Sequence, residues 1–170
     1  IGRYDEASVK IFDGKFNIGD IEITSFSIPH DAADPVGYTF SDGIKKLSVC
    51  TDIGYVTDEV SKNVMGSDVI LLEANHDVEM LKSGPYPYPL KKRILSDKGH
   101  LSNENAGVLC RELIEHGSKD IILGHLSMHN NHPDLAYVTV KSVLEEGGIK
   151  VSDCRLSVAS REFPGEIHVC

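Results

Sequence analysis

The chain has 170 residues, of which 41% are hydrophobic, and this is enough for one domain with a sizeable core. Its formal net charge of −9 argues against a protein that binds nucleic acid by bulk attraction, although a local basic cleft would be compatible with that charge. No run of about 18 apolar residues is present, so no segment is predicted to span a membrane.

Cysteines and basic residues refine this description. The four cysteines are scattered without a CxxC motif, which is typical of reduced, mostly buried thiols in a cytoplasmic protein. Lys91-Lys92-Arg93 is the only compact basic run. We interpret it as an exposed helix face in preference to a phosphate-binding patch.

The first third of the chain predicts a run of short strands. Alternating apolar and polar residues place strands at residues 9–12, 15–18, 20–27, 36–40 and 46–51. Asp13-Gly14, between the first two, is a strong hairpin signal. Pro29 cannot donate to a sheet ladder, so the third strand ends there and His30 is released from the pleat.

The remaining residues alternate between helical and strand patterns. Helices are predicted at 57–65, from a cap at 75–77 through residue 81, and at 91–96, 103–116 and 133–146. Strands are predicted at 68–74, 119–124, 149–151 and 155–159. Three prolines within residues 84–89 predict a rigid loop. The whole pattern indicates an α/β or α+β fold with helices packed on a sheet.

Three predicted strands end in a residue of a type that binds metals. His30 and Asp52 follow two strands near the start of the chain, and His125 follows a strand near its end. One such residue alone is more simply a turn residue or a satisfied core histidine. Three in this arrangement favour the open edge of a hydrolytic metal site, in which Asp52 would bridge two metals and each histidine would bind one.

The residues around these positions carry a family resemblance. Pro29-His30-Asp31, Thr51-Asp52-Ile53-Gly54 and Gly124-His125-Leu126-Ser127 resemble the third, fourth and fifth metal motifs of the metallo-β-lactamase superfamily. Longer strings, including Leu72-Glu73-Ala74-Asn75-His76-Asp77 and Gly99-His100-Leu101-Ser102-Asn103, are similar to its YycJ/WalJ group. The similarity extends from about Ile21 to Glu166.

This resemblance implies a four-layer αββα sandwich, two Zn²⁺ or Mn²⁺ ions and hydrolysis of phosphodiester bonds. The superfamily's HxHxDH motif is absent, because no two of the eight histidines are one residue apart. The chain also starts at Ile1, and its first methionine is Met65. We therefore expect residues 1–170 to be a single domain, the C-terminal half of the fold, with a mixed sheet and helices on one side. The expected partner is the N-terminal half of the same fold.

The resemblance also suggests roles for polar residues outside the metal motifs. Glu73 and His100 match a carboxylate–histidine pair of related nucleases, in which the histidine assists departure of the leaving oxygen. Ser102, Asn103, His76 and Asn130 are candidates for contacting the substrate. Helix capping is an equally simple interpretation of Ser102 and Asn103, and nearly as simple for His76.

The predicted function is a metal-dependent phosphodiesterase that uses a metal-activated hydroxide. The resemblance implies a DNA exonuclease acting 5′ to 3′, with DNA favoured over RNA as substrate. One alternative is a thioester or small cyclic-phosphodiester hydrolase of the same superfamily. Another is a non-catalytic half-domain that serves as an interaction module. An exposed sheet face is expected in an isolated half, so self-association into a homo-oligomer is predicted as well.

Overall fold

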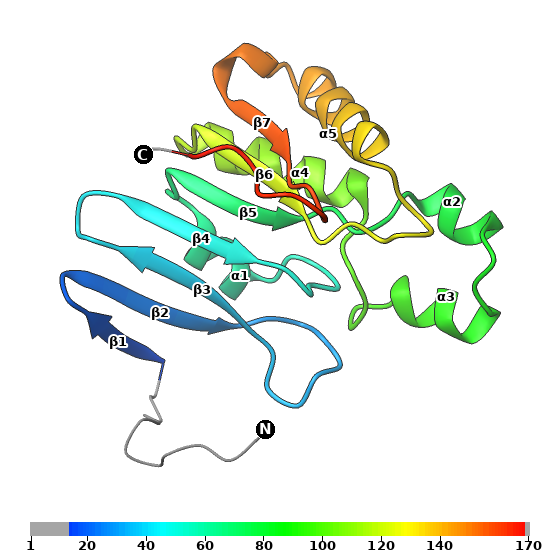
Figure 1. The fold of residues 1–170 in the computed structure, drawn as a ribbon, viewed down its shortest axis with the longest axis horizontal. Helices are drawn as coiled ribbons and strands as arrows, with labels where there is room; N and C mark the ends of the chain where they lie inside the picture. The colour runs from blue at the N-terminus through cyan, green and yellow to red at the C-terminus, as the bar shows by residue number, and fades with distance from the viewer. Residues whose placement is uncertain (1–13, 169–170) are drawn as a thin grey trace.

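Residues 14–168 of the chain are described in a computed structural model, and they contain one seven-stranded sheet (Figure 1). The strands lie side by side in the order in which they occur along the chain. Antiparallel pairing joins β1 to β2, β2 to β3 and β3 to β4, whereas β4 to β7 are parallel. The strands are β1 Lys15–Ile18, β2 Ile21–Ser27, β3 Val36–Ser41, β4 Lys46–Cys50, β5 Val69–Glu73, β6 Asp120–Gly124 and β7 Arg155–Val158.

Helices connect the parallel strands, as parallel pairing requires. They are α1 Asp58–Val64, α2 Val78–Ser83, α3 Tyr88–Ile94, α4 Asn103–Glu115 and α5 Pro133–Glu146, followed by the short 3₁₀ helix η2 Val151–Asp153. The helices α1, α4 and α5 lie on one face of the sheet, while α2 and α3 lie beyond the C-terminal ends of the central strands (Figure 1). No helix in the part of the chain that the structure describes is long and apolar enough to cross a membrane.

The main core lies between the sheet and these three helices. Alternate residues of the central strands point to that side, so Ile70, Leu72, Ile121 and Leu123 are fully buried. They pack in one cluster with apolar side chains of the covering helices, among them Val60, Val64, Leu109, Leu113, Val140 and Leu144. The amphipathic pattern of the helices is therefore satisfied by this single face of the sheet.

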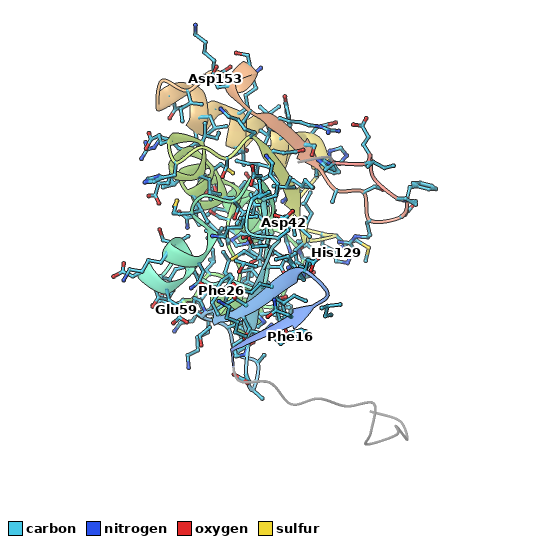
Figure 2. All side chains as sticks on the ribbon, turned by 90° about the vertical axis from the view of Figure 1, so that its left-hand side faces the viewer. Phe16, Phe26, Asp42, Glu59, His129 and Asp153 are labelled. Atoms are coloured by element: carbon cyan, nitrogen blue, oxygen red, sulfur yellow. The ribbon has the colours of Figure 1, made fainter. Side chains whose placement is uncertain are left out.

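The opposite face of the sheet is apolar but carries no helix. Strand register places Tyr38, Val49, Leu71 and Ile122 on this face, and Phe40 pairs with Leu47 beside them. Their side chains are only partly buried, and Leu47 is exposed. Figure 2 shows Glu59 of α1 on one side of the sheet and Phe16 on the other. The prediction of a mixed sheet with helices on one side is thus confirmed.

The segment after β7 covers one end of this open face. It turns back across the sheet (Figure 1), and His168 Nδ1 lies 2.7 Å from Asp120 Oδ2 at the start of β6. Arg155 of β7 also pairs with Glu166 of the returning segment. Leu71 and Ile122 line a hollow together with residues of this segment, so part of the open face is shielded by the chain itself.

Two local predictions are wrong, and one lies outside the described residues. The expected strand at 149–151 is replaced by η2, because the Asp153 carboxylate and the Asp153 N–H both bond the backbone of Lys150 and close a tight turn. The expected rigid loop at 84–89 ends early, since α3 already begins at Tyr88. Pro89 occupies the first turn of α3, where its missing N–H costs no hydrogen bond. The expected strand at residues 9–12 lies outside the described residues.

Candidate metal centre

Four strands bring candidate site residues to one edge of the sheet. β2 and β4 run in the same direction because β3 is antiparallel to both, and β5 and β6 continue that direction. Their C-terminal ends therefore carry His30, Asp52, Glu73 and His125 to the same edge. His100 joins them from the loop between α3 and α4.

Asp52 lies among three imidazole groups. Its Oδ1 is 3.6 Å from His30 Nε2, 3.7 Å from His125 Nε2 and 3.9 Å from His100 Nδ1. These separations exceed hydrogen-bond length. They are close to the distance of roughly 3.4 Å that separates two ligand atoms of a tetrahedral Zn²⁺ with bonds of about 2.1 Å. The structure thus brings the three predicted metal ligands together around one carboxylate.

The spacing also separates the two outer histidines. His30, Asp52 and His100 offer ligand atoms that all lie within 4.8 Å of one another. No such group among residues 14–168 contains both His30 and His125. His100 belongs to both groups of ligand atoms. Asp52 Oδ1 nevertheless lies at similar distances from His30 Nε2 and His125 Nε2, so its carboxylate stands between the two outer histidines, as a bridging ligand would.

Glu73 forms a buried support behind this cluster. Its side chain is 0% exposed, and its Oε1 accepts hydrogen bonds from His100 Nδ1 at 2.8 Å and from His125 Nδ1 at 2.7 Å. Its Oε2 accepts the backbone N–H groups of Ile53 and Leu101. Distances this short are those of charge-assisted hydrogen bonds, so Glu73 acts as an acceptor behind the histidines and leaves their Nε2 atoms free.

The hydrogen bonds of Glu73 shift the pKa values of the cluster. Burial alone would raise the pKa of Glu73, but the hydrogen bonds from His100 and His125 outweigh it, and the net pKa lies below its ordinary value. The same hydrogen bond raises the pKa of His125. The carboxylate is therefore held ionised in a buried position, where it fixes the tautomer and increases the basicity of the imidazole.

A close approach of two backbones sets the orientation of His30. Its Nδ1 lies 3.0 Å from the carbonyl oxygen of Gly99, which makes Nδ1 the protonated nitrogen and turns Nε2 toward Asp52. A Cβ at Gly99 would lie 2.1 Å from the carbonyl oxygen of Ile94, so only glycine fits there. The loop that carries His100 is thereby held against His30, and the centroids of the two rings are 5.0 Å apart.

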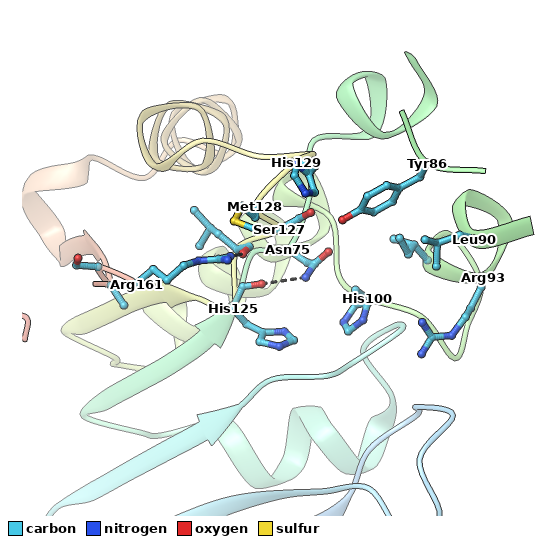
Figure 3. Close-up of a pocket in the computed structure, with 14 residues that line it drawn as sticks. Asn75, Tyr86, Leu90, Arg93, His100, His125, Ser127, Met128, His129 and Arg161 are labelled. Carbon is cyan, nitrogen blue, oxygen red and sulfur yellow. Dashed lines mark hydrogen bonds between the residues drawn. The ribbon is translucent and has the colours of Figure 1, made fainter. Parts of the chain in front are cut away.

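Two site residues have backbone conformations that favour glycine. Asp52 has φ of 60° and His125 has φ of 55°. The left-handed region costs an L-residue with a Cβ about 1–2 kcal/mol. Hydrogen bonds compensate, because the N–H of Ile53 is held by Glu73 and the Asn75 side-chain amide donates to the carbonyl of His125 at 2.9 Å (Figure 3). Such strain is concentrated at functional sites, where it aims side chains that relaxed turns would not.

The four predicted substrate contacts are all buried, and none of them lines the adjoining cleft. Ser102 caps α4 through the N–H of Asn105, and Asn103 exchanges two hydrogen bonds with Asn131. The backbone N–H and the side-chain amide of Asn130 both donate hydrogen bonds to the hydroxyl of Ser127. His76 is buried with no hydrogen-bond partner for either ring nitrogen among the described residues, and burial lowers its pKa to about 4. These side chains form a polar layer beneath the site.

A cleft of about 680 Å³ opens over the histidines (Figure 3). Its lining includes His100 and His125 together with Tyr86, Arg93, His129 and Arg161. Sequence reasoning treated Arg93 as part of an exposed helix face and gave no signal for Arg161, which lies 36 positions after His125. The prolines around Tyr86 indicated only a rigid loop. The sequence therefore predicted His100 and His125 as site residues, but not the other side chains that line the cleft.

Comparisons with known proteins connect this geometry to a family. A sequence-family model described as the beta-lactamase superfamily domain matches residues 4–126. The exodeoxyribonuclease YycJ of Bacillus anthracis is 46% identical over 135 residues, which cover 79% of this chain and 51% of the relative. The exodeoxyribonuclease WalJ of Streptococcus pneumoniae serotype 2 (strain D39) is 43% identical over 153 residues, covering 89% and 57%. The chain thus spans about half the length of these curated relatives.

A solved structure agrees with the fold. The metallo-beta-lactamase fold protein YhfI from Bacillus subtilis superposes with a TM-score of 0.63 at 18% sequence identity. The match covers 89% of this chain and 53% of YhfI. At this level of identity the similarity establishes the architecture alone, including the sheet with helices on one face.

Glu73→Gln is expected to weaken metal binding by about 10- to 100-fold, because an amide cannot hold both imidazoles as a carboxylate does. A proton competes with the metal for His125, so affinity rises with pH until the raised pKa of His125 is passed. In Glu73→Gln, the pH at which metal affinity stops rising is expected to be lower. Competition with a chromophoric zinc chelator, in the full-length protein, measures both effects. Glu115→Gln, in the last turn of α4, is the control. A Glu73→Gln affinity within twofold of wild type would contradict the assigned role.

His76 is expected to make stability depend on pH. Its folded pKa of about 4 lies below the ordinary value of 6.5, so between these values the unfolded state binds more protons. The free energy of unfolding therefore falls as the pH drops from 6.5 to 4, by up to about 3 kcal/mol. Urea unfolding of metal-free protein at several pH values measures the slope. His76→Leu should lose this component, whereas the exposed-site control His116→Leu should keep it. Equal slopes in wild type and His76→Leu would refute the prediction.

Proposed function

The chain belongs to the metallo-β-lactamase superfamily, in its YycJ/WalJ-type group, and on this premise we propose that it provides the C-terminal half of a metal-dependent phosphodiesterase that degrades DNA. The observation that carries the proposal is the carboxylate of Asp52 with three imidazole nitrogens 3.6 to 3.9 Å from its Oδ1. The names of the relatives, both exodeoxyribonucleases, favour DNA over RNA. We carry the 5′ to 3′ direction over as a proposal from the resemblance to the group.

The donor set fits two divalent cations, Zn²⁺ or Mn²⁺. His30 and His125 offer neutral imidazole nitrogens, and Asp52 offers a carboxylate that both sites can share. Three residues do not fill two coordination shells, so the upstream half is expected to supply further ligands. When bound, the cations would lower the pKa of a water molecule and neutralise charge that develops on the phosphoryl oxygens.

Residues beside the metal ligands fix the positions of protons and the orientation of the histidine rings. Glu73 keeps the proton of His100 on Nδ1, so Nε2 is the nitrogen available to a substrate. A proton on Nε2 of His100 can pass to the departing oxygen, and the hydrogen bond to Glu73 holds the ring in one orientation for that transfer. Asn75 fixes the backbone of His125 and thereby the direction of its ring. The cytoplasmic location remains a prediction from the scattered cysteines of the sequence.

Asp52→Ala and His30→Ala are expected to lower the rate on 5′-phosphorylated DNA by roughly 10³-fold or more in the full-length protein, because each removes a ligand from the catalytic cations. Elemental analysis should show reduced metal content. Asp58→Ala, in the first turn of α1, is the matched control and should retain both. Full activity with wild-type metal content in either ligand variant would refute the assignment. Side-by-side assays on RNA, a cyclic phosphodiester and a thioester test the alternative substrates.

We also propose that the N-terminal half of the fold packs on the open sheet face. The support is the row of partly exposed apolar side chains there, including Leu47, Val49 and Leu71. Side chains of this kind are normally covered by a second layer. In the chain without its partner half, the same face would favour self-association.

Neighbouring leucines of β5 provide a matched test of this packing. Leu72 faces the helices and is fully buried, so Leu72→Ala is expected to cost about 2–5 kcal/mol in any length of the protein. Leu71 faces the open side, and Leu71→Ala should cost less than half as much in the 170-residue chain. In the full-length protein its cost should rise to within about 1 kcal/mol of that of Leu72→Ala. Urea denaturation measures all four values. An unchanged cost of Leu71→Ala in the two lengths would contradict the proposed packing.

A further inference from the structure

The cleft above the metal centre differs in charge from the rest of the chain. The sequence has 26 acidic and 17 basic residues. The residues that line the cleft nevertheless include two arginines and three histidines, and no aspartate or glutamate among the described residues belongs to the lining. A recessed surface of one sign concentrates its field and attracts ligands of opposite charge. The ligand that suits this cleft is therefore an anion.

The two arginines lie on opposite sides of the catalytic histidines. Figure 3 shows Arg161 beside His125 and Arg93 beyond His100. Arg93 is held by both carboxylate oxygens of Asp31, which neutralises most of its charge. Arg161 instead donates to the backbone carbonyl of Leu126, and no carboxylate pairs with it within residues 14–168. The uncompensated cation of the cleft is thus Arg161.

The Arg161 guanidinium also lies next to the candidate metal centre. Arg161 and His125 line the same cleft, and their side chains lie beside each other (Figure 3). The bond to Leu126 anchors the guanidinium at the residue that follows His125 in the chain. Arginine can present several N–H donors to a phosphate, so the donors left over by this anchor remain available to an anion.

Aromatic rings form another part of the cleft wall. Tyr86 and His129 lie edge to face, with ring centroids 5.8 Å apart and an angle of 78° between their planes. Tyr86 is positioned by the adjoining Pro85 and Pro87, and His129 by the loop after β6. Rigid aromatic faces beside a cationic groove are the combination with which proteins bind unpaired bases together with their phosphates.

We propose that this cleft binds the nucleotides that adjoin the scissile bond of a nucleic acid strand, with Arg161 contacting a flanking phosphodiester and the Tyr86–His129 pair stacking a base. The proposal rests on the proposed nuclease function and adds a recognition site to it. A small diester has a single phosphate, which the metal centre would hold, so it offers no flanking phosphodiester to Arg161. Recognition of a strand and hydrolysis of a diester are therefore separable properties of the site.

Binding and catalysis are tested separately in the full-length protein. Fluorescence anisotropy with labelled single-stranded DNA and RNA octamers, in chelator so that no cleavage occurs, measures affinity at several salt concentrations. The variants are Arg161→Ala, Arg161→Lys, Tyr86→Ala and Tyr86→Phe. Arg111→Ala on α4 and Tyr88→Ala, whose exposed ring lies outside the cleft lining, are the matched controls.

Arg161→Ala is expected to weaken octamer binding about tenfold and to reduce the slope of log K against log salt by about 0.7, the value for one single-strand phosphate contact. Arg161→Lys should restore the slope. Tyr86→Ala should weaken binding about tenfold with little change in slope, and Tyr86→Phe should retain stacking. The ratio of kcat/KM on the octamer to that on bis(p-nitrophenyl) phosphate should fall about tenfold in Arg161→Ala. The DNA and RNA arms identify the preferred strand.

Affinity and salt slope of Arg161→Ala equal to those of Arg111→Ala would overturn the proposal. So would an equal loss of kcat/KM on the octamer and on the small diester, which would assign Arg161 to the metal centre itself. A wild-type protein that binds the octamer through Arg161 and Tyr86 but cleaves no nucleic acid would refute the nuclease function and leave the binding site standing. A protein that cleaves DNA while its variants bind as wild type would refute the binding site alone.

Discussion

The site depends on one buried charge, the carboxylate of Glu73. An ionised group with no exposure costs several kcal/mol unless hydrogen bonds compensate it. Here the donors come from three loops: Ile53 follows β4, His100 and Leu101 precede α4, and His125 follows β6. Because each loop contributes a donor, the carboxylate joins all three. The energetic requirement to satisfy Glu73 therefore also fixes the positions of the groups that surround Asp52.

The sheet explains why the loops meet at this point. Parallel pairing places Glu73 opposite Gly124, so the residue after Gly124 begins its turn directly beside the carboxylate. His125 then adopts a left-handed backbone, which a regular strand continuation would not require. The imidazole is consequently aimed by register, by turn conformation and by a hydrogen bond together. Precision of this kind is needed where ligand atoms must lie within about half an ångström of a productive geometry.

The sequence predicted the parts of the site that follow from local signals. His30, Asp52 and His125 each follow an apolar strand, and strand ends are visible in a sequence as a change of pattern. The bond between Glu73 and His125 joins residues 52 positions apart and depends on the register of β5 with β6, which no local pattern encodes. For that reason the prediction from the sequence paired the Glu73 carboxylate with His100 and did not include His125.

The substrate candidates illustrate the opposite case. Polar residues near a predicted site were expected to face the substrate, but Ser102 and Asn103 are buried because capping and an amide pair already satisfy them. Buried polar groups with complete hydrogen bonds are normal parts of a core. Arg161 was missed for a related reason, since it reaches the cleft because β7 pairs in parallel with β6, with Val158 opposite Leu123. No local sequence pattern encodes that pairing.

The open sheet face and the candidate metal centre would both be completed by a second layer of structure. The face carries apolar side chains that a second layer would bury, and the edge beside it presents too few ligands for two cations. A second sheet packed on that face would lie about 10 Å away, which is close enough for loops at the ends of its strands to bring ligands to the same edge. The packing free energy of such a layer would then also position its ligands. Stability and metal binding would thereby be linked, since whatever separates the layers also separates the two sets of ligands.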